Sequence, residues 1–270
     1  MVMKLDVRDV SFLYKNKMVL NGVNIAVESG NVIVILGKKG SGKTTLFKII
    51  MDFMKPKSGL VLFDGKEKTG ICAGIIGKPL FCDNMSGLDN LKYYLGKEYD
   101  ENTVFEYADR WGISDLLNIK VSKYSPAMKQ KLSLILSFSS KREILIFDEP
   151  IDSLDEYSID VFCECVTKAK SENKIIMIAT HIAYALNKCC DKMYELKDGC
   201  LFEYMPTVKE YKITFVSPGN AQEAANKIKE NVHLLTIDDA IIVSVENDEI
   251  LEVIKRVYDY NIISVERKTI

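Results

Sequence analysis

Nine consecutive residues between two apolar segments constrain the fold of this chain more than any other feature. Residues 37–45 read Gly-Lys-Lys-Gly-Ser-Gly-Lys-Thr-Thr and match the phosphate-binding loop pattern without a mismatch. Glycines let successive backbone N–H groups turn inward around an anion, and the helix expected to begin at Lys43 adds its positive end. The apolar run 32–36 before the loop predicts a buried strand, and residues 45–54 after it are apolar at helical spacing. Because the loop stands between these two segments, phosphate binding is favoured over a chance Gly/Lys turn.

The loop supplies the first group of candidate site residues. We expect Lys43 to reach the β- and γ-phosphates of a bound nucleotide, and the Thr44 hydroxyl to ligate Mg²⁺. Lys39 either adds positive potential or is only solvated. The candidate nucleotide-binding residues of the loop are Gly37, Lys38, Lys39, Gly40, Ser41, Gly42, Lys43, Thr44 and Thr45.

A second candidate element stands at the end of the apolar run 144–147. Asp148, Glu149 and Pro150 follow this run directly. Two carboxylates at the end of a buried strand are costly unless something compensates their charge, although a solvated pair is the simpler alternative. We expect Asp148 to hold Mg²⁺ through water, and Glu149 to orient and deprotonate an attacking water.

Residues 4–204, which contain these two motifs, resemble the ATP-binding subunits of ABC transporters. Residues 152–155, Asp-Ser-Leu-Asp, look like the D-loop of that family, and Thr180-His181 after the strand 175–179 looks like its switch histidine. Residues 123–132 look like a degraded signature motif. The resemblance implies that His181 contacts the γ-phosphate and that Tyr14 stacks on adenine. It also implies contacts across a dimer from Ser125, Pro126, Ala127, Met128, Ser153 and Asp155.

Two departures from the family pattern bear on the rate of hydrolysis. The signature usually runs Ser-Gly-Gly, whereas this chain has Ser125-Pro126-Ala127, which removes one N–H donor and adds a methyl group. Gly77 stands where the family usually has Gln or Glu. Since each ABC site is shared, the altered signature affects the site of the partner subunit. We therefore expect a slow homodimeric ATPase, or a heterodimer whose second subunit has an intact signature.

The strings 79–91 and 124–132 are similar to those of bacterial bacitracin, lantibiotic and phenol-soluble-modulin exporters. This resemblance implies an ATPase motor subunit that works with a separate transmembrane permease in peptide or drug export and antibiotic resistance. Two alternatives remain open. The chain could be an ATP-gated regulatory or structural subunit with little or no hydrolysis, or a soluble P-loop NTPase of another family.

The order of apolar segments predicts two domains. Strands alternating with helices imply an α/β fold, which the resemblance identifies as a P-loop NTPase of ABC type with an antiparallel β subdomain and a helical subdomain at 82–140. We place this nucleotide-binding domain at 1–205. Residues 206–270 predict a small α+β ferredoxin-like domain of order βαββαβ. Its predicted hairpin has strands at 232–237 and 240–245 around a turn at Asp238-Asp239, and Asp248 is expected to cap a helix. Structural padding or a dimer contact is the expected role of this domain, with a small-ligand sensor as the alternative.

Composition excludes several classes of protein. Hydrophobic residues make up 47% of the chain, charged residues 27%, and the formal net charge is -2, which argues against a disordered chain and a basic nucleic-acid binder. No apolar run approaches the ~18 residues of a membrane helix, and no secretory signal is evident. Seven cysteines without a Cys-x-x-Cys pair argue against zinc and disulfides. We expect a cytoplasmic protein that reaches the inner face of the membrane only through its permease.

Overall fold

The computed structural model of this chain describes residues 2–67, 70–77, 80–182, 184–204, 208–228, 233–237, 240–246 and 250–267. It divides into two units, Met1–Tyr204 and Met205–Ile270. Four features of the sequence prediction lie outside the described residues: Pro79 in the exporter-like string, the start of the predicted hairpin at 232, its turn at Asp238-Asp239, and the cap at Asp248.

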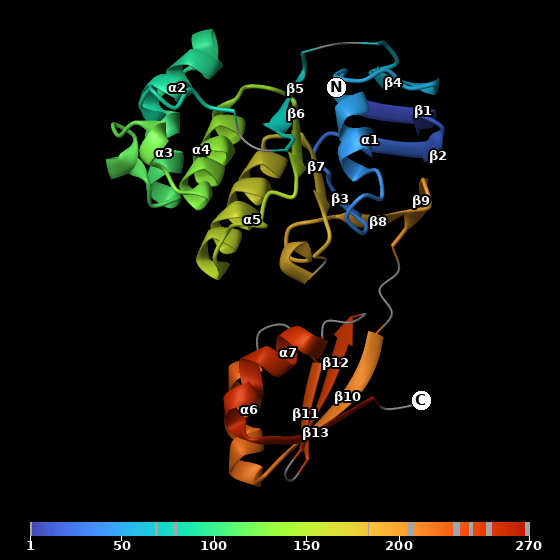
Figure 1. Cartoon of the computed structure of the whole chain (residues 1–270), viewed down its shortest axis with the longest axis vertical. Helices are drawn as coiled ribbons and strands as arrows, with labels where there is room; N and C mark the ends of the chain where they lie inside the picture. The colour runs from blue at the N-terminus through green and yellow to red at the C-terminus, as the bar shows by residue number, and fades with distance from the viewer. Residues whose placement is uncertain are drawn as a thin grey trace. The chain divides into compact units, whose positions relative to one another are not determined.

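A six-stranded mixed sheet forms the centre of the first unit (Figure 1). In spatial order its strands are β5 (Cys72–Ile75), β6 (Ile144–Asp148), β7 (Ile175–Thr180), β3 (Val32–Leu36), β8 (Lys192–Lys197) and β9 (Cys200–Glu203). The first five run parallel, and β9 pairs antiparallel with β8. Strands β3, β6 and β7 are buried along their whole length, which explains why they read as continuous apolar runs. This sheet confirms the predicted α/β class.

A second, antiparallel sheet has the order β2-β1-β4, with β1 at Lys4–Tyr14, β2 at Lys17–Glu28 and β4 at Ser58–Phe63. Helix α1 (Lys43–Ile50) lies between this sheet and the central one (Figure 1). Leu46 and Phe47 of α1 pack in one apolar cluster with side chains of both sheets. The helix that follows the phosphate-binding loop is thus packed against both sheets.

Helix α1 is shorter than the apolar spacing predicted, since that pattern continues to Met54 whereas the helix ends at Ile50. Asp52 adopts a left-handed backbone with φ +62°, and the Phe53 N–H donates to the Lys48 carbonyl oxygen at 2.8 Å. This is a helix-ending turn, which satisfies a carbonyl group of the last helical turn.

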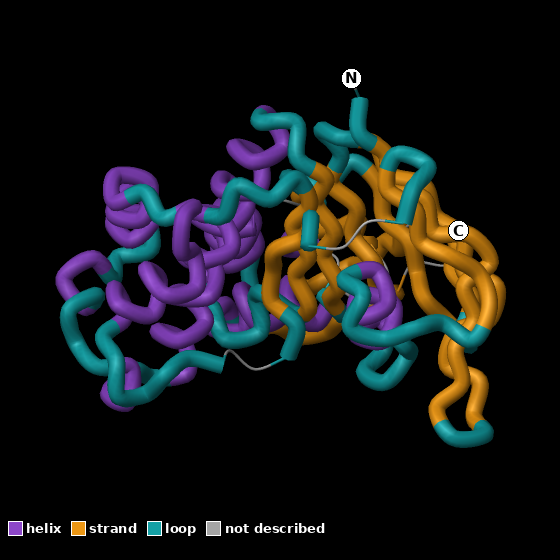
Figure 2. The backbone as a smooth tube through the Cα atoms, turned by 90° about the horizontal axis from the view of Figure 1, so that it is seen from above, coloured by secondary structure: helices purple, strands orange, loops and turns teal. Residues whose placement is uncertain are grey.

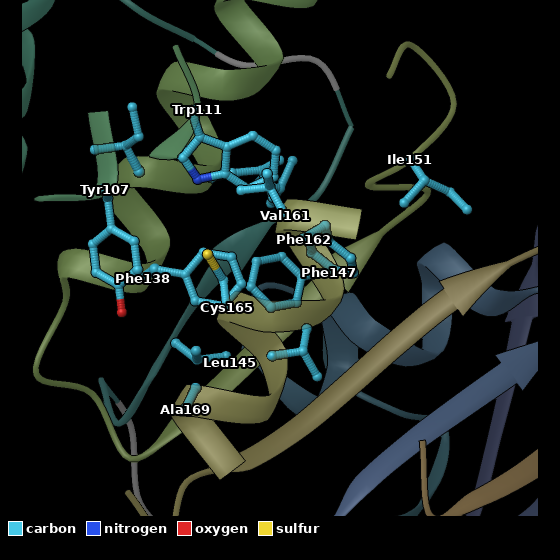
Figure 3. Close-up of a cluster of buried hydrophobic side chains, with 14 of the residues drawn as sticks. Tyr107, Trp111, Phe138, Leu145, Phe147, Ile151, Val161, Phe162, Cys165 and Ala169 are labelled. Atoms are coloured by element: carbon cyan, nitrogen blue, oxygen red, sulfur yellow. The ribbon is translucent and has the colours of Figure 1, made fainter. Parts of the chain in front are cut away.

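The helical part of the first unit lies beside its strand-rich part in both views (Figures 1 and 2). Its helices are α2 (Gly87–Leu95), α3 (Glu101–Arg110) and α4 (Pro126–Ser139), and α5 (Glu156–Ser171) connects β6 to β7. An aromatic cluster joins these elements: the ring centroid of Phe147 lies 5.2 Å from Phe138 and 5.4 Å from Phe162 (Figure 3). Within the part of the chain that the structure describes, no helix is both long and apolar enough to span a bilayer.

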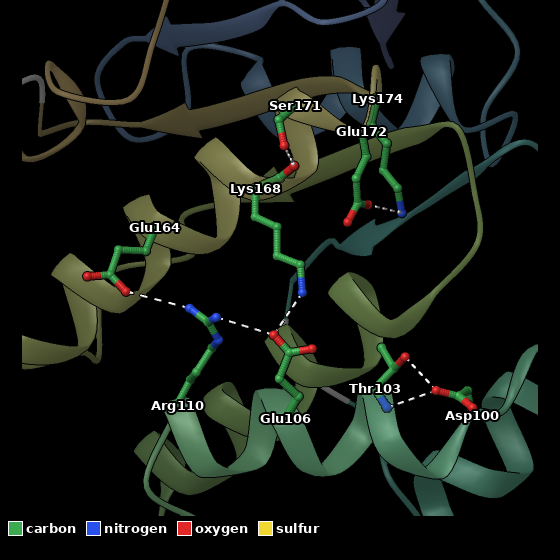
Figure 4. Close-up of polar contacts among 9 residues, drawn as sticks. All are labelled: Asp100, Thr103, Glu106, Arg110, Glu164, Lys168, Ser171, Glu172 and Lys174. Carbon is green, nitrogen blue, oxygen red and sulfur yellow. Dashed lines mark hydrogen bonds and ion pairs between the residues drawn. The ribbon is translucent and has the colours of Figure 1, made fainter.

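Charged side chains also connect α3 with α5 (Figure 4). The Lys168 ammonium donates to Glu106 Oε1 at 2.8 Å, and Arg110 contacts the same oxygen at 3.2 Å and Glu164 at 3.8 Å. These groups are partly exposed, so each pair contributes modestly to stability.

The second unit is a four-stranded antiparallel sheet with two helices. Its elements in chain order are β10 (Val208–Phe215), α6 (Pro218–Ile228), β11 (His233–Ile237), β12 (Ala240–Glu246), α7 (Ile250–Val257) and β13 (Ile262–Arg267). The spatial strand order is β11-β12-β10-β13. With the order βαββαβ, this arrangement is that of a ferredoxin-like fold. A short 3₁₀ helix, Tyr258–Tyr260, follows α7 in this unit, and the first unit contains the 3₁₀ helices Gly96–Glu98, Ser114–Leu116, Val121–Lys123 and Tyr184–Leu186.

Candidate functional site

The phosphate-binding loop connects the carboxyl end of β3 to the start of α1. Gly40 and Gly42 adopt left-handed backbones with φ +85° and +110°. A Cβ added at Gly42 would lie 3.0 Å from the Val19 carbonyl oxygen, whereas one added at Gly40 would meet nothing within 4 Å. Gly42 precedes α1 without a side-chain cap, so the first N–H groups of the helix are available to an anion.

Lys43 reaches from α1 back across the loop. Its side chain is only 4% exposed, and its ammonium donates to the Gly37 carbonyl oxygen at 2.6 Å. The same Nζ lies 3.2 Å from Glu149 Oε1. A buried ammonium needs such partners. Lys43 therefore joins the loop to the carboxylates at the end of β6.

The Thr44 hydroxyl donates to Asp148 Oδ2 at 2.6 Å. The second carboxylate oxygen, Oδ1, is buried and has no hydrogen-bond partner among the described residues. The Ser41 hydroxyl of the phosphate-binding loop is likewise buried and has no hydrogen-bond partner among the described residues. Burial raises the pKa of Asp148, with the charge of Glu149 adding to the effect and the Thr44 hydrogen bond opposing it. A carboxylate with one uncompensated oxygen, bonded through its other oxygen to the Thr44 hydroxyl, fits Mg²⁺, which prefers oxygen ligands.

Glu149 lies between Lys43 and His181. Its Oε2 is 3.0 Å from His181 Nδ1, while Oε1 faces Lys43. Since a carboxylate only accepts hydrogen bonds, the contact assigns a hydrogen to Nδ1. Asp152 Oδ1 lies 3.8 Å from the same nitrogen. Burial raises the pKa of Asp152, and the negative charge of Glu149 raises it further.

The glutamate also has an unusual backbone. Glu149 adopts φ +50°, a left-handed conformation that is uncommon for a residue other than glycine. Its N–H donates to the Ala179 carbonyl oxygen at 2.8 Å, which ties it to the end of β7.

The signature-like residues form the start of α4. Ser125 caps the helix by accepting a hydrogen bond from the Met128 N–H at 3.2 Å, and Pro126 occupies the first helical position. Ala127 is half-buried. Proline suits this position because its φ angle matches the helix, and a first-position N–H has no partner within the helix.

Other predicted residues are placed as follows. Asp155 caps α5 by accepting from the Ser158 N–H at 2.8 Å, and Ser153 is exposed in the turn before it. Tyr14, at the end of β1, is 64% exposed. Gly77 has φ +74°, and a Cβ there would meet nothing within 4 Å.

The remaining residues of the phosphate-binding loop face outward to different degrees. Lys38 and Lys39 are exposed, and Thr45 is half-buried in the first turn of α1.

The structure brings together five of the predicted residues. Its hydrogen bonds and ion pairs join Lys43, Thr44, Asp148, Glu149 and His181. The side-chain contacts of Ser125 and Asp155 instead stay at the ends of their own helices.

Two residues of the predicted motifs, for which no individual role was predicted, lie against this group or against the neighbouring Pro150. Asp152 lies beside His181, and Gln130 Nε2 donates to the Pro150 carbonyl oxygen at 2.9 Å. An acidic residue three positions after Glu149 is a visible signal for the first. Gln130 lies in the signature-like string 123–132, but nothing in that string indicates a contact with Pro150, 20 residues away in the chain.

The chain is similar to known proteins in both sequence and structure. Residues 20–152 match the family model described as ABC transporter. The chain is 30% identical over 206 residues to the ABC transporter ATP-binding protein NatA of Bacillus subtilis, covering 70% of this chain and 82% of NatA. It is 30% identical over 205 residues to the lantibiotic transport ATP-binding protein SrtF of Streptococcus pyogenes, covering 72% and 87%. A solved structure of the ATP-binding subunit of an ABC transporter superimposes with a TM-score of 0.68 at 25% identity, covering 73% of this chain and 87% of that one.

Proposed function

This chain belongs to the family of ABC transporter ATP-binding subunits, and we propose that it binds MgATP, closes as a dimer and hydrolyses the γ-phosphate to drive export of a peptide or drug. The observation that carries the proposal is the contact chain Thr44–Asp148 and Lys43–Glu149–His181 at the mouth of the phosphate-binding loop. These are the groups that in-line attack of water on a γ-phosphate requires.

Each of these side chains has a definite task. The loop N–H groups and Lys43 hold the phosphates, and Lys43 exchanges its contact with Glu149 for the more strongly negative γ-phosphate. Glu149 is thereby free to orient and deprotonate the attacking water. His181, bonded to Glu149, contacts the γ-phosphate and senses its presence.

Thr44 and Asp148 are the residues that would hold Mg²⁺. When bound, the ion neutralises charge that develops on the β- and γ-phosphates. The unpartnered Oδ1 of Asp148 supports this assignment. Tyr14, exposed at the end of β1, is the proposed stacking surface for adenine.

The proposed partners are a second ATP-binding subunit and a transmembrane permease. Ser125, Pro126, Ala127 and Met128 at the start of α4, together with Ser153 and Asp155, would face the ATP of the second subunit. That subunit is either a second copy of this chain or a different ATP-binding chain. The permease would bring the chain to the inner face of the membrane. The similarity to SrtF, a lantibiotic transport ATP-binding protein, supports a peptide substrate.

A second candidate function is an ATP-gated subunit with little or no hydrolysis. Gly77 favours it, because this position has open space beside it and supplies no side chain to water or metal. The loss of one transition-state contact would slow hydrolysis by about 100- to 1000-fold if it mattered as much as an oxyanion-hole donor.

Glu149→Gln separates the two functions. In a motor, the variant should bind MgATP, lose hydrolysis and accumulate as an ATP-bound dimer, which size-exclusion chromatography with light scattering detects. Glu203→Gln, the same change at an exposed carboxylate on β9, should behave as wild type. If Glu149→Gln and wild type show the same dimer fraction and the same low phosphate release, the chain is an ATP-gated subunit instead.

A further inference from the structure

The backbone at Glu149 needs support from outside its own turn. It is left-handed, with φ +50°, and the next residue is Pro150, whose ring restricts the residue before it. A strained conformation persists only where the surroundings hold it, and such positions gather at functional sites. One support is the Glu149 N–H, which donates to the Ala179 carbonyl oxygen at 2.8 Å. Pro150 has no N–H to contribute.

The second support comes from α4. Gln130 Nε2 donates to the Pro150 carbonyl oxygen at 2.9 Å, and this contact is partly buried. Pro150 and the following Ile151 are both buried. The peptide that carries Glu149 is therefore held at its N–H by β7 and one residue later at a carbonyl by the side chain of Gln130.

The neighbours of Gln130 on α4 reach other parts of the unit. The Lys129 ammonium contacts Asp83 at 2.7 Å, and the Lys131 ammonium donates to the Trp111 carbonyl oxygen at 3.2 Å. Of these three consecutive side chains, Gln130 is the one that reaches the Glu149 turn. It lies five residues after Ser125, little more than one helical turn from the signature end of α4.

We propose that Gln130 is a positioning residue. Its hydrogen bond to the Pro150 carbonyl oxygen holds the segment Glu149-Pro150 so that the Glu149 carboxylate faces the γ-phosphate. The same bond links the start of α4 to Glu149, the base of this chain's own site. The effect on hydrolysis rests on the proposed ATPase function. Because Ser125 and Gln130 belong to the same end of α4, a ligand that displaces the start of this helix also displaces the Gln130 amide that is bonded to the Pro150 carbonyl oxygen. Engagement of the partner's ATP would then bias the base in this chain.

The test uses Gln130→Glu and Gln130→Ala in the full chain. Glutamate keeps the shape of the side chain but cannot donate when ionised, so it faces the Pro150 carbonyl with an acceptor. We expect kcat to fall at least tenfold in both variants while the dissociation constant for MgATP, measured by calorimetry, changes less than twofold. In the Glu149→Gln background, Gln130→Ala should lower the residual ATPase no further, because the base is already absent.

A second readout does not need hydrolysis. Amide hydrogen exchange of the segment 148–152 should be at least tenfold faster in Gln130→Ala. Without the Gln130 hydrogen bond to Pro150, the turn opens more often and breaks the bond from the Glu149 N–H to Ala179. Lys131→Met is the matched control, because it removes a neighbouring contact from α4 to a backbone carbonyl without touching Pro150. It should leave both kcat and the exchange of 148–152 within twofold of wild type.

The outcomes are distinguishable. Wild-type exchange of 148–152 in Gln130→Ala, or equal effects of Lys131→Met and Gln130→Ala on that segment, would overturn the positioning role. A wild-type chain that binds MgATP but releases no phosphate would overturn the proposed hydrolysis alone, and the exchange result would still decide the role of Gln130.

Discussion

Asp148→Asn tests the metal assignment because it removes a charge and leaves the shape. In the nucleotide-free chain, the amide oxygen can still accept from Thr44, and the desolvation of an ionised carboxylate is gone. We expect the free energy of unfolding to stay within about 1 kcal/mol of wild type, on the side of greater stability.

The pH dependence follows from the raised pKa of Asp148. A carboxyl group whose pKa is higher in the folded chain destabilises it above that pKa, and the penalty disappears as the pH falls through the folded pKa toward the unfolded one. The advantage of Asp148→Asn over wild type should therefore be largest near pH 7 and shrink toward pH 4.

Magnesium should reverse the order of the two proteins. If the Asp148 contact contributes about 1.5–3 kcal/mol, as contacts to charged groups do, its loss weakens MgATP binding by about 10- to 150-fold. At a ligand concentration of about 100 times the wild-type dissociation constant, ligand stabilisation falls from about 2.7 to about 0.3–1.4 kcal/mol. For a unit of this size, the wild-type shift corresponds to about 5–11 °C in melting temperature.

Thermal melts with ATP in EDTA, and with ATP in millimolar magnesium, measure this directly. The added stabilisation by magnesium should be clear in wild type and small in Asp148→Asn. An unchanged magnesium-dependent shift in the variant would refute the assignment. A nucleotide-free variant less stable by more than about 3 kcal/mol would instead show that Asp148 is a structural hydrogen-bond partner, because losses of that size come from broken buried contacts.

Three other predictions concern the phosphate-binding loop, the aromatic cluster and the charged contact between α3 and α5. Gly42→Ala places a methyl group 3.0 Å from the Val19 carbonyl oxygen at a left-handed backbone, so we expect a loss of about 1–3 kcal/mol in stability and at least tenfold weaker ATP binding by calorimetry. Phe162→Ala opens the aromatic cluster and should lower stability by about 3–5 kcal/mol, and the melting temperature by about 6–20 °C in calorimetric scans. Lys168 lowers the pKa of Glu106; the stabilisation it provides, about 0.2–1 kcal/mol, is present at neutral pH and lost as the pH falls through the lowered pKa, so urea titrations of Lys168→Met and wild type should converge in acid.

The sequence was most informative where backbone and burial decide the pattern. The run 32–36 predicted a buried strand because a parallel strand is covered on both faces, and β3 has those bounds. The loop at 37–45 was readable because its glycines are needed for backbone geometry. The end of α1 was not readable, since apolar spacing continued past Asp52, whose left-handed turn ends the helix four residues earlier than the pattern does.

Contacts between distant segments were outside the reach of the sequence. Asp148 and Glu149 were visible as a pair, but the left-handed backbone of Glu149 depends on β7 and α4 around it. Gln130 carries an ordinary helical residue type, and only the packing of α4 against the turn after β6 brings its amide to Pro150. Such contacts follow from tertiary packing, which a single sequence does not display.

The structure changes how the Ser125-Pro126-Ala127 departure is understood. Pro126 fits the first position of α4, so the helix loses no stability to it, but that position supplies no N–H. The Met128 N–H is already bonded to the Ser125 hydroxyl, which leaves the Ala127 N–H as the remaining donor of the three first helical residues.

Pro126→Ala restores one donor and keeps a good helix former. In a homodimer, closure on ATP should strengthen by about tenfold or more, the value of one hydrogen bond to a charged group, measured as the ATP concentration for half-maximal dimer in the Glu149→Gln background. No change in this concentration for Pro126→Ala would show that the start of α4 does not face a phosphate in the homodimer.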